Sequence, residues 1–202
     1  MRLIATHSPG FDPETPWVEH DSQTTAESRL FSQISARRGS PHTLREHVFT
    51  RLICPDWVNV IAFTEDGELL VVEQYRHGID ASTQEIIGGV CEADEEPLLS
   101  AQRELLEETG HASEQWLSLG FCEPNPAVQN NRCHFFLALG CRPVAELDLD
   151  PSEELRVWAY PWKEWEARLQ RGGVAHALVL AAFLRLTFWE GWEAFRRTRL
   201  LD

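Results

Sequence analysis

The strongest constraint on this chain is an acidic segment, residues 95–109, whose apolar spacing predicts a helix. At 3.6 residues per turn, Glu104 lies in angle between Glu107 and Glu108, so these carboxylates share one sector of roughly 100°. An apolar stripe beside that sector is formed by Leu98, Ala101 and Leu105. The segment is therefore expected to be a helix that buries one face and gathers negative charge next to it.

Stacked carboxylates of this kind indicate a cation. Like charges at this spacing oppose helix formation by a few tenths of a kcal/mol per pair, so the sequence must have a use for the field they create. Mg²⁺ and Mn²⁺ take oxygen ligands, whereas zinc prefers the histidine and cysteine side chains that this cluster lacks. The alternative is a solvated helix face, because glutamate-rich helices are common.

Apolar runs on either side of the acidic segment predict a sheet. The expected strands are residues 48–53, 57–63, 69–74, 133–139 and 155–160, and the further expected helices are 162–169 and 174–195. Asp66-Gly67 between two of these runs is a hairpin signal. Pro97 near the start of the acidic helix and Gly110 just past its end mark the helix limits. One helix in mid-chain between sheet segments favours an α/β sandwich.

The first 45 residues differ in texture from the rest of the chain. Residues 1–45 are polar and weakly periodic, contain four prolines, and show only at 28–34 a hint of a short ordered piece. We expect an N-terminal extension that serves as a dimerisation arm, followed by one domain over residues 46–202.

The composition limits which binding partners and which cellular compartment are expected. The net charge of −14, from 32 acidic and 18 basic residues, repels nucleic acid and anionic membranes, so neither is an expected partner. Five cysteines without a CxxC pair, and no export signal at the N-terminus, favour a reducing cytoplasm. The most apolar run, residues 174–189, is broken by His176 and Arg185 and is shorter than the ~20 residues that a membrane span needs.

The segment from Gly89 to His111 resembles the Nudix box, the family signature G-x5-E-x7-R-E-U-x-E-E-x-G-U, in which U is a bulky aliphatic residue. Eight of its nine positions match without a gap: Gly89, Glu95, Arg103, Glu104, Leu105, Glu107, Glu108 and Gly110. His111 stands at the ninth position, after the predicted end of the helix. The resemblance implies a Nudix-type α/β/α sandwich with a mixed central sheet.

The resemblance also assigns roles within the box. It implies that Mg²⁺, or Mn²⁺ as a substitute, is held by Glu104, Glu107, Glu108 and the backbone carbonyl of Gly88. The resemblance implies structural roles for Gly89, Glu95, Arg103 and Gly110. Of these, Glu95 and Arg103 would pair and so fix the loop against the helix.

In similar enzymes the general base is a glutamate of the box or one on a loop well downstream. Glu107 and Glu108 are the catalytic candidates in the box, and Glu153 and Glu154, just before the expected strand 155–160, are the candidates on the loop. So acidic a loop is also typical of a solvated surface.

Three features outside the box bear on the substrate. Gln74-Tyr75-Arg76 and Glu85-Ile86-Ile87-Gly88-Gly89 resemble the QYR and E-x-P-A-G segments of ADP-ribose and nucleotide-sugar pyrophosphatases, with Ile87-Gly88 in place of Pro-Ala. Pro126 lies 15 residues beyond His111, a position associated with the ADP-ribose pyrophosphatases. The expected substrate contacts are Arg76, Glu85, Pro126 and Arg132. Arg76 offers a bidentate fork for a phosphate or ribose, or alternatively pairs with a surface acid.

These features together predict a metal-dependent Nudix pyrophosphohydrolase. Its expected substrate is a small nucleoside diphosphate conjugate, either ADP-ribose, cleaved to AMP and ribose 5-phosphate, or a nucleotide sugar. One alternative is hydrolysis of nucleoside triphosphates, dinucleoside polyphosphates or capped RNA. The other is a non-catalytic sensor that binds a nucleotide sugar. In similar ADP-ribose pyrophosphatases the N-terminal segment builds a homodimer that shares each pocket, and residues 1–55 could do so here.

Overall fold

The computed structural model describes residues 12–149 and 154–200. Contacts divide them into two units. The first contains the chain up to Cys54 together with Asn125–Asn131, and the second contains Pro55–Pro124 and the residues from Arg132 onward.

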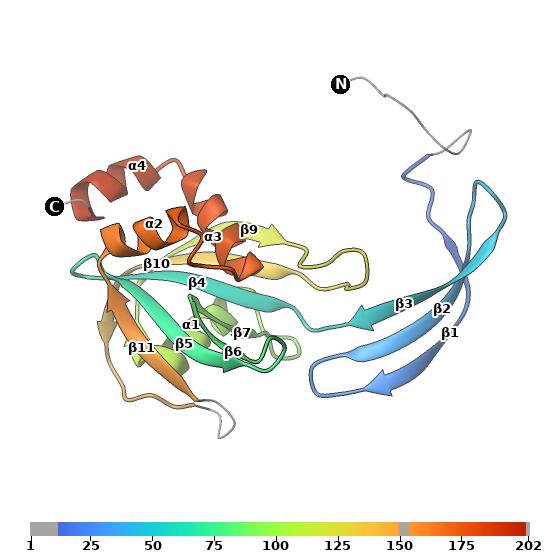
Figure 1. The fold of residues 1–202 in the computed structure, drawn as a ribbon, viewed down its shortest axis with the longest axis horizontal. Helices are drawn as coiled ribbons and strands as arrows, with labels where there is room; N and C mark the ends of the chain where they lie inside the picture. The colour runs from blue at the N-terminus through green and yellow to red at the C-terminus, as the bar shows by residue number, and fades with distance from the viewer. Residues whose placement is uncertain (1–11, 150–153, 201–202) are drawn as a thin grey trace. The chain divides into compact units, whose positions relative to one another are not determined.

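The first unit is built on a three-stranded antiparallel sheet, drawn in blue to cyan in Figure 1. Its strands are β1 (Val18–Glu27), β2 (Ser32–Gly39) and β3 (Glu46–Ile53), in the order β1-β2-β3. Ion pairs cross between the first two strands, with Arg37 Nη2 2.5 Å from Asp21 Oδ2 and Arg38 Nη2 2.6 Å from Glu19 Oε2. Every residue of β1 is exposed, so backbone hydrogen bonds and charge pairs, rather than an apolar face, hold this strand.

The second unit contains an eight-stranded mixed sheet. Its strands are β4 (Trp57–Thr64), β5 (Leu69–Arg76), β6 (Ala81–Glu85), β7 (Ile87–Val90), β8 (His111–Ala112), β9 (Gln115–Cys122), β10 (Cys133–Pro143) and β11 (Leu155–Tyr160). The main path runs β11-β5-β4-β10-β8, with β6 paired to β5, β7 to β4 and β9 to β10. Among the described strands of this sheet, β4 and β10 are the one pair that runs in parallel. The β4–β5 hairpin turns at Gly67 with a φ of 79°, as Asp66-Gly67 predicts.

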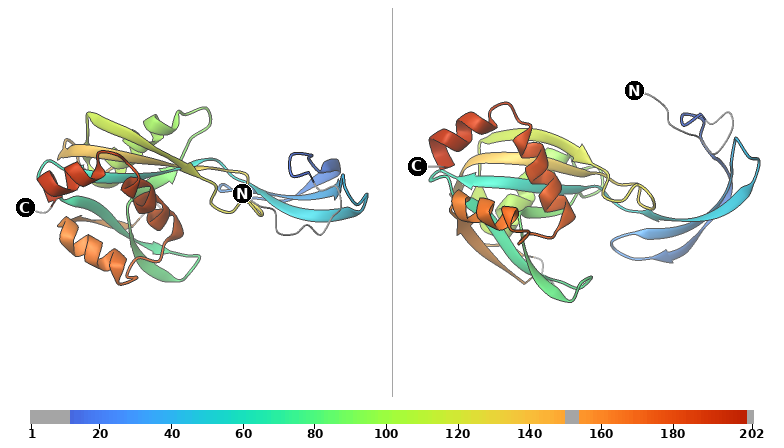
Figure 2. Two further views of the ribbon diagram at one scale, coloured as in Figure 1. Left: turned by 90° about the horizontal axis from the view of Figure 1, so that it is seen from above. Right: turned by 45° about the horizontal axis from the view of Figure 1, so that its top comes forward.

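Helices cover both faces of this sheet. They are α1 (Pro97–Thr109), α2 (Trp162–Gln170), α3 (Ala177–Thr187) and α4 (Trp192–Phe195), followed by the π-helical turn η1 (Arg196–Leu200). Figure 2 shows α1 on one side of the strands and the later helices on the other. This arrangement is the expected α/β/α sandwich with a mixed sheet. Among the described residues no helix is long and apolar enough to cross a membrane.

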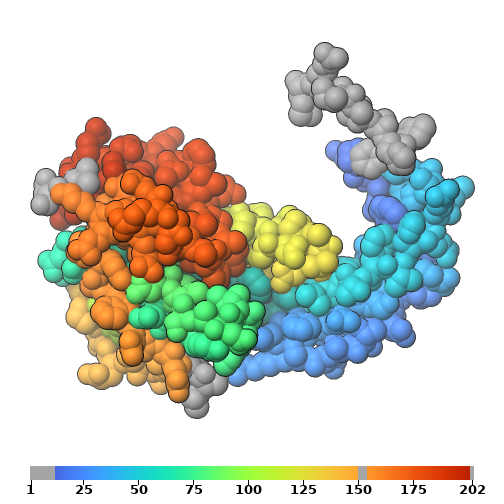
Figure 3. Space-filling view, viewed as in Figure 1, coloured from blue at the N-terminus to red at the C-terminus, as the bar shows by residue number. Residues whose placement is uncertain are grey.

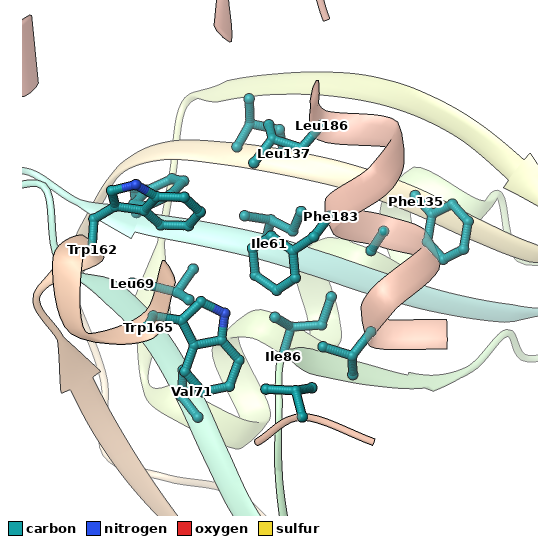
Figure 4. Close-up of a cluster of buried hydrophobic side chains, with 14 of the residues drawn as sticks. Ile61, Leu69, Val71, Ile86, Phe135, Leu137, Trp162, Trp165, Phe183 and Leu186 are labelled. Carbon is teal, nitrogen blue, oxygen red and sulfur yellow. The ribbon is translucent and has the colours of Figure 1, made fainter. Parts of the chain in front are cut away.

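Each layer has its own apolar core. Ala101 and Leu105 of α1 pack against Val58 and Val60 of β4. On the other face, tryptophan and phenylalanine side chains from α2 and α3 pack onto the sheet, as the close-up in Figure 4 shows. Trp165 is 0% exposed. The side chains of α2 and α3, orange to red, form the surface over this part of the unit in Figure 3.

One expected helix is broken. Residues 174–195 were expected to be helical throughout, but α3 ends at Thr187 and α4 begins at Trp192. Gly191 precedes α4, and a side chain there would run into the Trp189 ring. The break lets Trp192 turn back to the core, where it is 5% exposed and 5.0 Å from the Trp162 ring.

Candidate active site

The acidic helix α1 is fixed at its C-terminal end by a glycine. Gly110 has a φ of 68° and its N–H donates to Leu106 O at 2.7 Å, an αL cap. A side chain at this position would also overlap the carbonyl oxygen of Ala145. Only glycine suits both the backbone conformation and the space at position 110.

Arg103 is the centre of a charge cluster on α1. Its guanidinium donates to Glu95 at 3.0 and 3.2 Å, to Glu104 at 2.8 Å and to Glu107 at 3.0 Å. A further hydrogen bond of 3.1 Å reaches the carbonyl of Val90. The expected Glu95–Arg103 pair is therefore present, and the same arginine also contacts two of the glutamates expected to bind metal.

The cluster fixes the ionisation of its members. Hydrogen bonds from Arg103, together with one from Ser100 at 2.5 Å, lower the pKa of Glu95 to about 2. The carboxylates in turn raise the pKa of Arg103. Because Glu95 stays charged well below neutral pH, it fastens the loop before α1 to the helix.

Glu108 lies on the buried side of α1 and is 5% exposed. The backbone N–H of Gly88 donates to its Oε2 at 3.2 Å. The neighbouring Gly89 lies against Glu104, and a side chain at Gly89 would overlap the Glu104 carboxylate. Gly89 thus lets β7 approach the carboxylate helix closely, because it has no side chain at the contact with Glu104.

The donor set suits a hard divalent cation. The acidic cluster around α1 contains four carboxylates, Glu95, Glu104, Glu107 and Glu108, and the first three pair with the guanidinium of Arg103. All of these donors are oxygen atoms, as Mg²⁺ and Mn²⁺ require. Within the described ranges no three acidic, histidine or cysteine side chains already form a metal site.

Two of the expected substrate contacts, Arg76 and Glu85, contact each other. Arg76 forms a bidentate pair with Glu85, at 2.8 and 2.6 Å. Thr83 also donates to Glu85, and His176 Nε2 lies 3.7 Å from the same carboxylate. Burial alone would raise the pKa of Glu85, which is 1% exposed, but Arg76 and Thr83 leave this pKa below its ordinary value. Arg76 keeps 42% of its side chain exposed.

The remaining predicted residues are dispersed. Glu154 is exposed just before β11. It borders a hollow lined by Glu73, Gln74, Tyr75, Ser82, Leu155 and Arg156. Glu153 lies outside the described residues.

Pro126 and Arg132 belong to different units. Pro126 borders a pocket of the first unit with Trp17, Arg38 and Phe49. Arg132 lies in the second unit, where its guanidinium is 4.4 Å from the centroid of the Phe121 ring.

Sequence reasoning missed three residues near this site. Thr83 and His176 contact Glu85, and Asn59 is buried beside β7. Asn59 is the one with a signal in the sequence, since it is a single amide inside the apolar run of β4.

The geometry of α1 and β7 agrees with the family comparison. The family model for the NUDIX domain matches residues 55–183, which is most of the chain. The chain therefore belongs to the Nudix family, and the resemblance read from the box is confirmed. The protein is a Nudix hydrolase.

The chain is similar to three proteins of known name. The chain is 27% identical to the ADP-ribose pyrophosphatase of Mycobacterium tuberculosis over 173 residues, which are 83% of this chain and 84% of the relative. It is 34% identical over 104 residues to the ADP-ribose pyrophosphatase of Bacillus subtilis, covering 51% of this chain and 56% of that protein. Over the same length it is 38% identical to the methanol dehydrogenase activator of Bacillus methanolicus, covering 50% and 56%.

A solved structure confirms the fold. The crystal structure of an ADP compounds hydrolase superposes with a TM-score of 0.77 at 20% identity, covering 92% of this chain and 97% of that one. The expected α/β/α fold is therefore confirmed.

Proposed function

We propose that this Nudix hydrolase cleaves the diphosphate bridge of ADP-ribose to AMP and ribose 5-phosphate, with Mg²⁺ as its metal and Mn²⁺ as a substitute. The observation that carries the proposal is the grouping of Glu104 and Glu108 on α1 against Gly88 and Gly89 of β7. The ADP-ribose pyrophosphatase of M. tuberculosis, aligned over 83% of this chain, supports the choice of substrate.

The residues of the acidic cluster would have different roles in the reaction. Glu104, Glu107, Glu108 and the carbonyl of Gly88 would hold the metal ion, with Glu95 and Arg103 keeping the loop against the helix. When bound, a divalent cation supplies neutralisation of the diphosphate charge and makes an attacking water more acidic. In-line attack by that water on one phosphorus breaks the bridging P–O bond, and the leaving phosphate keeps the electron pair.

A carboxylate of this chain takes the proton from the water. The candidates are Glu107 and Glu108 on α1 and Glu153 and Glu154 on the loop before β11. Loss of the base lowers kcat by about 10²–10⁴-fold. Glutamine at Glu153 or Glu154 tests the loop directly, whereas glutamine at Glu107 or Glu108 also removes a proposed metal ligand.

Arg76, the last residue of β5, would bind the substrate. Its pairing with the buried Glu85 fixes the guanidinium on β5 while part of it stays exposed. A preorganised charge of this kind suits a phosphate or terminal ribose. We also propose contacts from Pro126 and Arg132 to the second half of the substrate.

The proposal extends to assembly and compartment. We propose a homodimer joined through the first unit, and a reducing cytoplasm as its location. All five cysteines are free in the structure, which supports a reducing compartment.

A panel of substrates tests the proposal. Purified protein with Mg²⁺ is assayed against ADP-ribose, GDP-mannose, UDP-glucose, NADH, diadenosine polyphosphates and nucleoside triphosphates, with detection of the released monophosphate. Preferential release of AMP from ADP-ribose is the expected result. Turnover of triphosphates or polyphosphates alone would overturn the substrate assignment and keep the metal site, and no turnover with Mg²⁺ or Mn²⁺ would favour a sensor.

A further inference from the structure

A buried amide interrupts one of the most apolar strands of the protein. Asn59 lies in β4 between Val58 and Val60 and is 7% exposed. By alternation it shares a strand face with Ile61, whose side chain belongs to the core beneath α2 and α3. Burying an amide costs free energy unless its polar atoms form hydrogen bonds. The hydrogen-bond partners of Asn59 therefore indicate what this residue does in the protein.

Both ends of the amide have partners, and they fix its orientation. Asn59 Nδ2 donates to the carbonyl of Ile87 at 3.3 Å, and the thiol of Cys133 donates to Asn59 Oδ1 at 3.3 Å. The carbonyl of Ile87 can only accept a hydrogen bond, so the nitrogen of the amide must face it. The oxygen is thereby left for the thiol.

The carbonyl of Ile87 and the N–H of Gly88 belong to the same peptide unit. That N–H donates to Glu108 Oε2 at 3.2 Å. Because the peptide is planar, holding its carbonyl also orients its N–H. The hydrogen bonds therefore run in one direction, from the Cys133 thiol through Asn59 and the Ile87–Gly88 peptide to the carboxylate of Glu108.

The chain also makes room for this amide. Gly88 is the cross-strand partner of Asn59, and a side chain at Gly88 would overlap Asn59 Nδ2 and approach Val58 O closely. Asn59 thus occupies space that an alanine side chain at position 88 would need.

We propose that Asn59 is a positioning residue for metal binding, which acts through the Ile87–Gly88 peptide on Glu108. Through these hydrogen bonds, a residue packed in the core on one face of the sheet orients a carboxylate of α1 on the other face. The inference rests on the proposed metal site of α1 but not on the identity of the substrate. Residues that orient metal ligands from behind typically change metal affinity by about 10–100-fold when lost.

Direct metal binding tests this role. The full-length protein is titrated with Mn²⁺ alone and free Mn²⁺ is followed by electron paramagnetic resonance, for the wild type and for Asn59→Leu. Asn59→Leu keeps the approximate shape and removes both hydrogen bonds, so its Kd for Mn²⁺ should rise by about 10-fold or more. An unchanged Kd overturns the proposal, and so does a wild-type protein that binds no Mn²⁺. An ADP-ribose assay that fails while Asn59→Leu still weakens Mn²⁺ binding overturns only the proposed substrate.

Controls separate positioning from general destabilisation. Ile61→Val removes one buried methyl group from the same strand without touching β7, and should lower the thermal midpoint but leave the Kd for Mn²⁺ unchanged. Two further variants leave Asn59 in place and change only the thiol that donates to it. Cys133→Ser retains a donor to Asn59 Oδ1 and should bind Mn²⁺ like the wild type, whereas Cys133→Ala should bind it more weakly. Equal weakening in Ile61→Val and Asn59→Leu contradicts the positioning role.

Discussion

Arg103 stabilises the acidic helix because it is the cation that Glu95, Glu104 and Glu107 share. Replacement by Met keeps the aliphatic stem and removes the charge. We expect Arg103→Met to lower the free energy of unfolding at pH 7 by about 1.5–3 kcal/mol, the range for hydrogen bonds to charged groups. Urea unfolding measures this loss.

The loss should depend on pH in a defined window. The pKa of Glu95 is about 2 in the folded protein against an ordinary value of 4.5, so its pairing contributes fully above pH 4.5 and is lost as the pH falls through 2. The difference between wild type and Arg103→Met should therefore shrink from pH 4.5 towards 2. Arg142→Met is the matched control, since it changes the net charge equally and removes only an exposed pair with Glu114. A difference that stays constant with pH would contradict this role of Glu95.

At the residue scale, the acidic cluster could be predicted from the sequence, but the residues that contact its neighbours from other elements could not. The Glu95–Arg103 pair could be predicted because both residues lie in one contiguous motif. Thr83 and His176 reach Glu85 from separate parts of the chain, and Asn59 meets Ile87 only through the pairing of β4 with β7. A single polar residue has no periodicity, so its partners follow from the order of strands rather than from spacing.

At the scale of elements, the end of α1 depends on the left-handed glycine at position 110. Gly110→Ala should lower the free energy of unfolding by the left-handed conformational cost of about 1–2 kcal/mol, plus about 1–3 kcal/mol for the overlap with Ala145 O. Gly140→Ala is the matched control. Its φ of 65° is nearly the same and nothing lies within 4 Å of the added side chain.

The two glycine variants are compared by urea unfolding. Gly110→Ala should cost more than Gly140→Ala, because only the first meets another part of the backbone. Equal costs would mean that the loop at Ala145 moves aside freely.

Most elements with a regular apolar pattern were predictable, and polar or very short ones were not. Strand β9 was missed although Leu117, Leu119 and Phe121 alternate along it. The expected runs at 57–63, 69–74, 133–139 and 155–160 agree with β4, β5, β10 and β11. Strands β1 and β2 were missed because backbone pairing and ion pairs, not an apolar face, hold them. The short β6 and β7 offer too few residues for a period of two.

At the scale of the molecule, the first unit has exposed apolar side chains that a second copy could cover. Val48 on β3 is 68% exposed and Val18 on β1 is 56% exposed. We expect light scattering to give twice the 23.1 kDa of one chain. Val48→Asp should shift the protein towards the monomer, because a charge buried in an interface without a partner is costly.

Val144→Asp is the control for this experiment. Val144 is 55% exposed and lies in the second unit, so a charge there should leave the mass unchanged. A wild-type monomer at all concentrations, or a dimer that survives Val48→Asp, would contradict assembly through this face.

The central claim is that the carboxylates of α1 drive hydrolysis of the ADP-ribose diphosphate bridge. It is tested most directly by the rate of AMP release from ADP-ribose at saturating Mg²⁺, for the wild type and for Glu108→Gln. Glu108→Gln keeps the size of the side chain and an acceptor for the Gly88 N–H, and removes the charge. The account predicts that kcat falls by at least about 10²-fold while the thermal midpoint stays near that of the wild type. A fully active Glu108→Gln protein, or a wild type that releases no AMP from ADP-ribose, would contradict the claim.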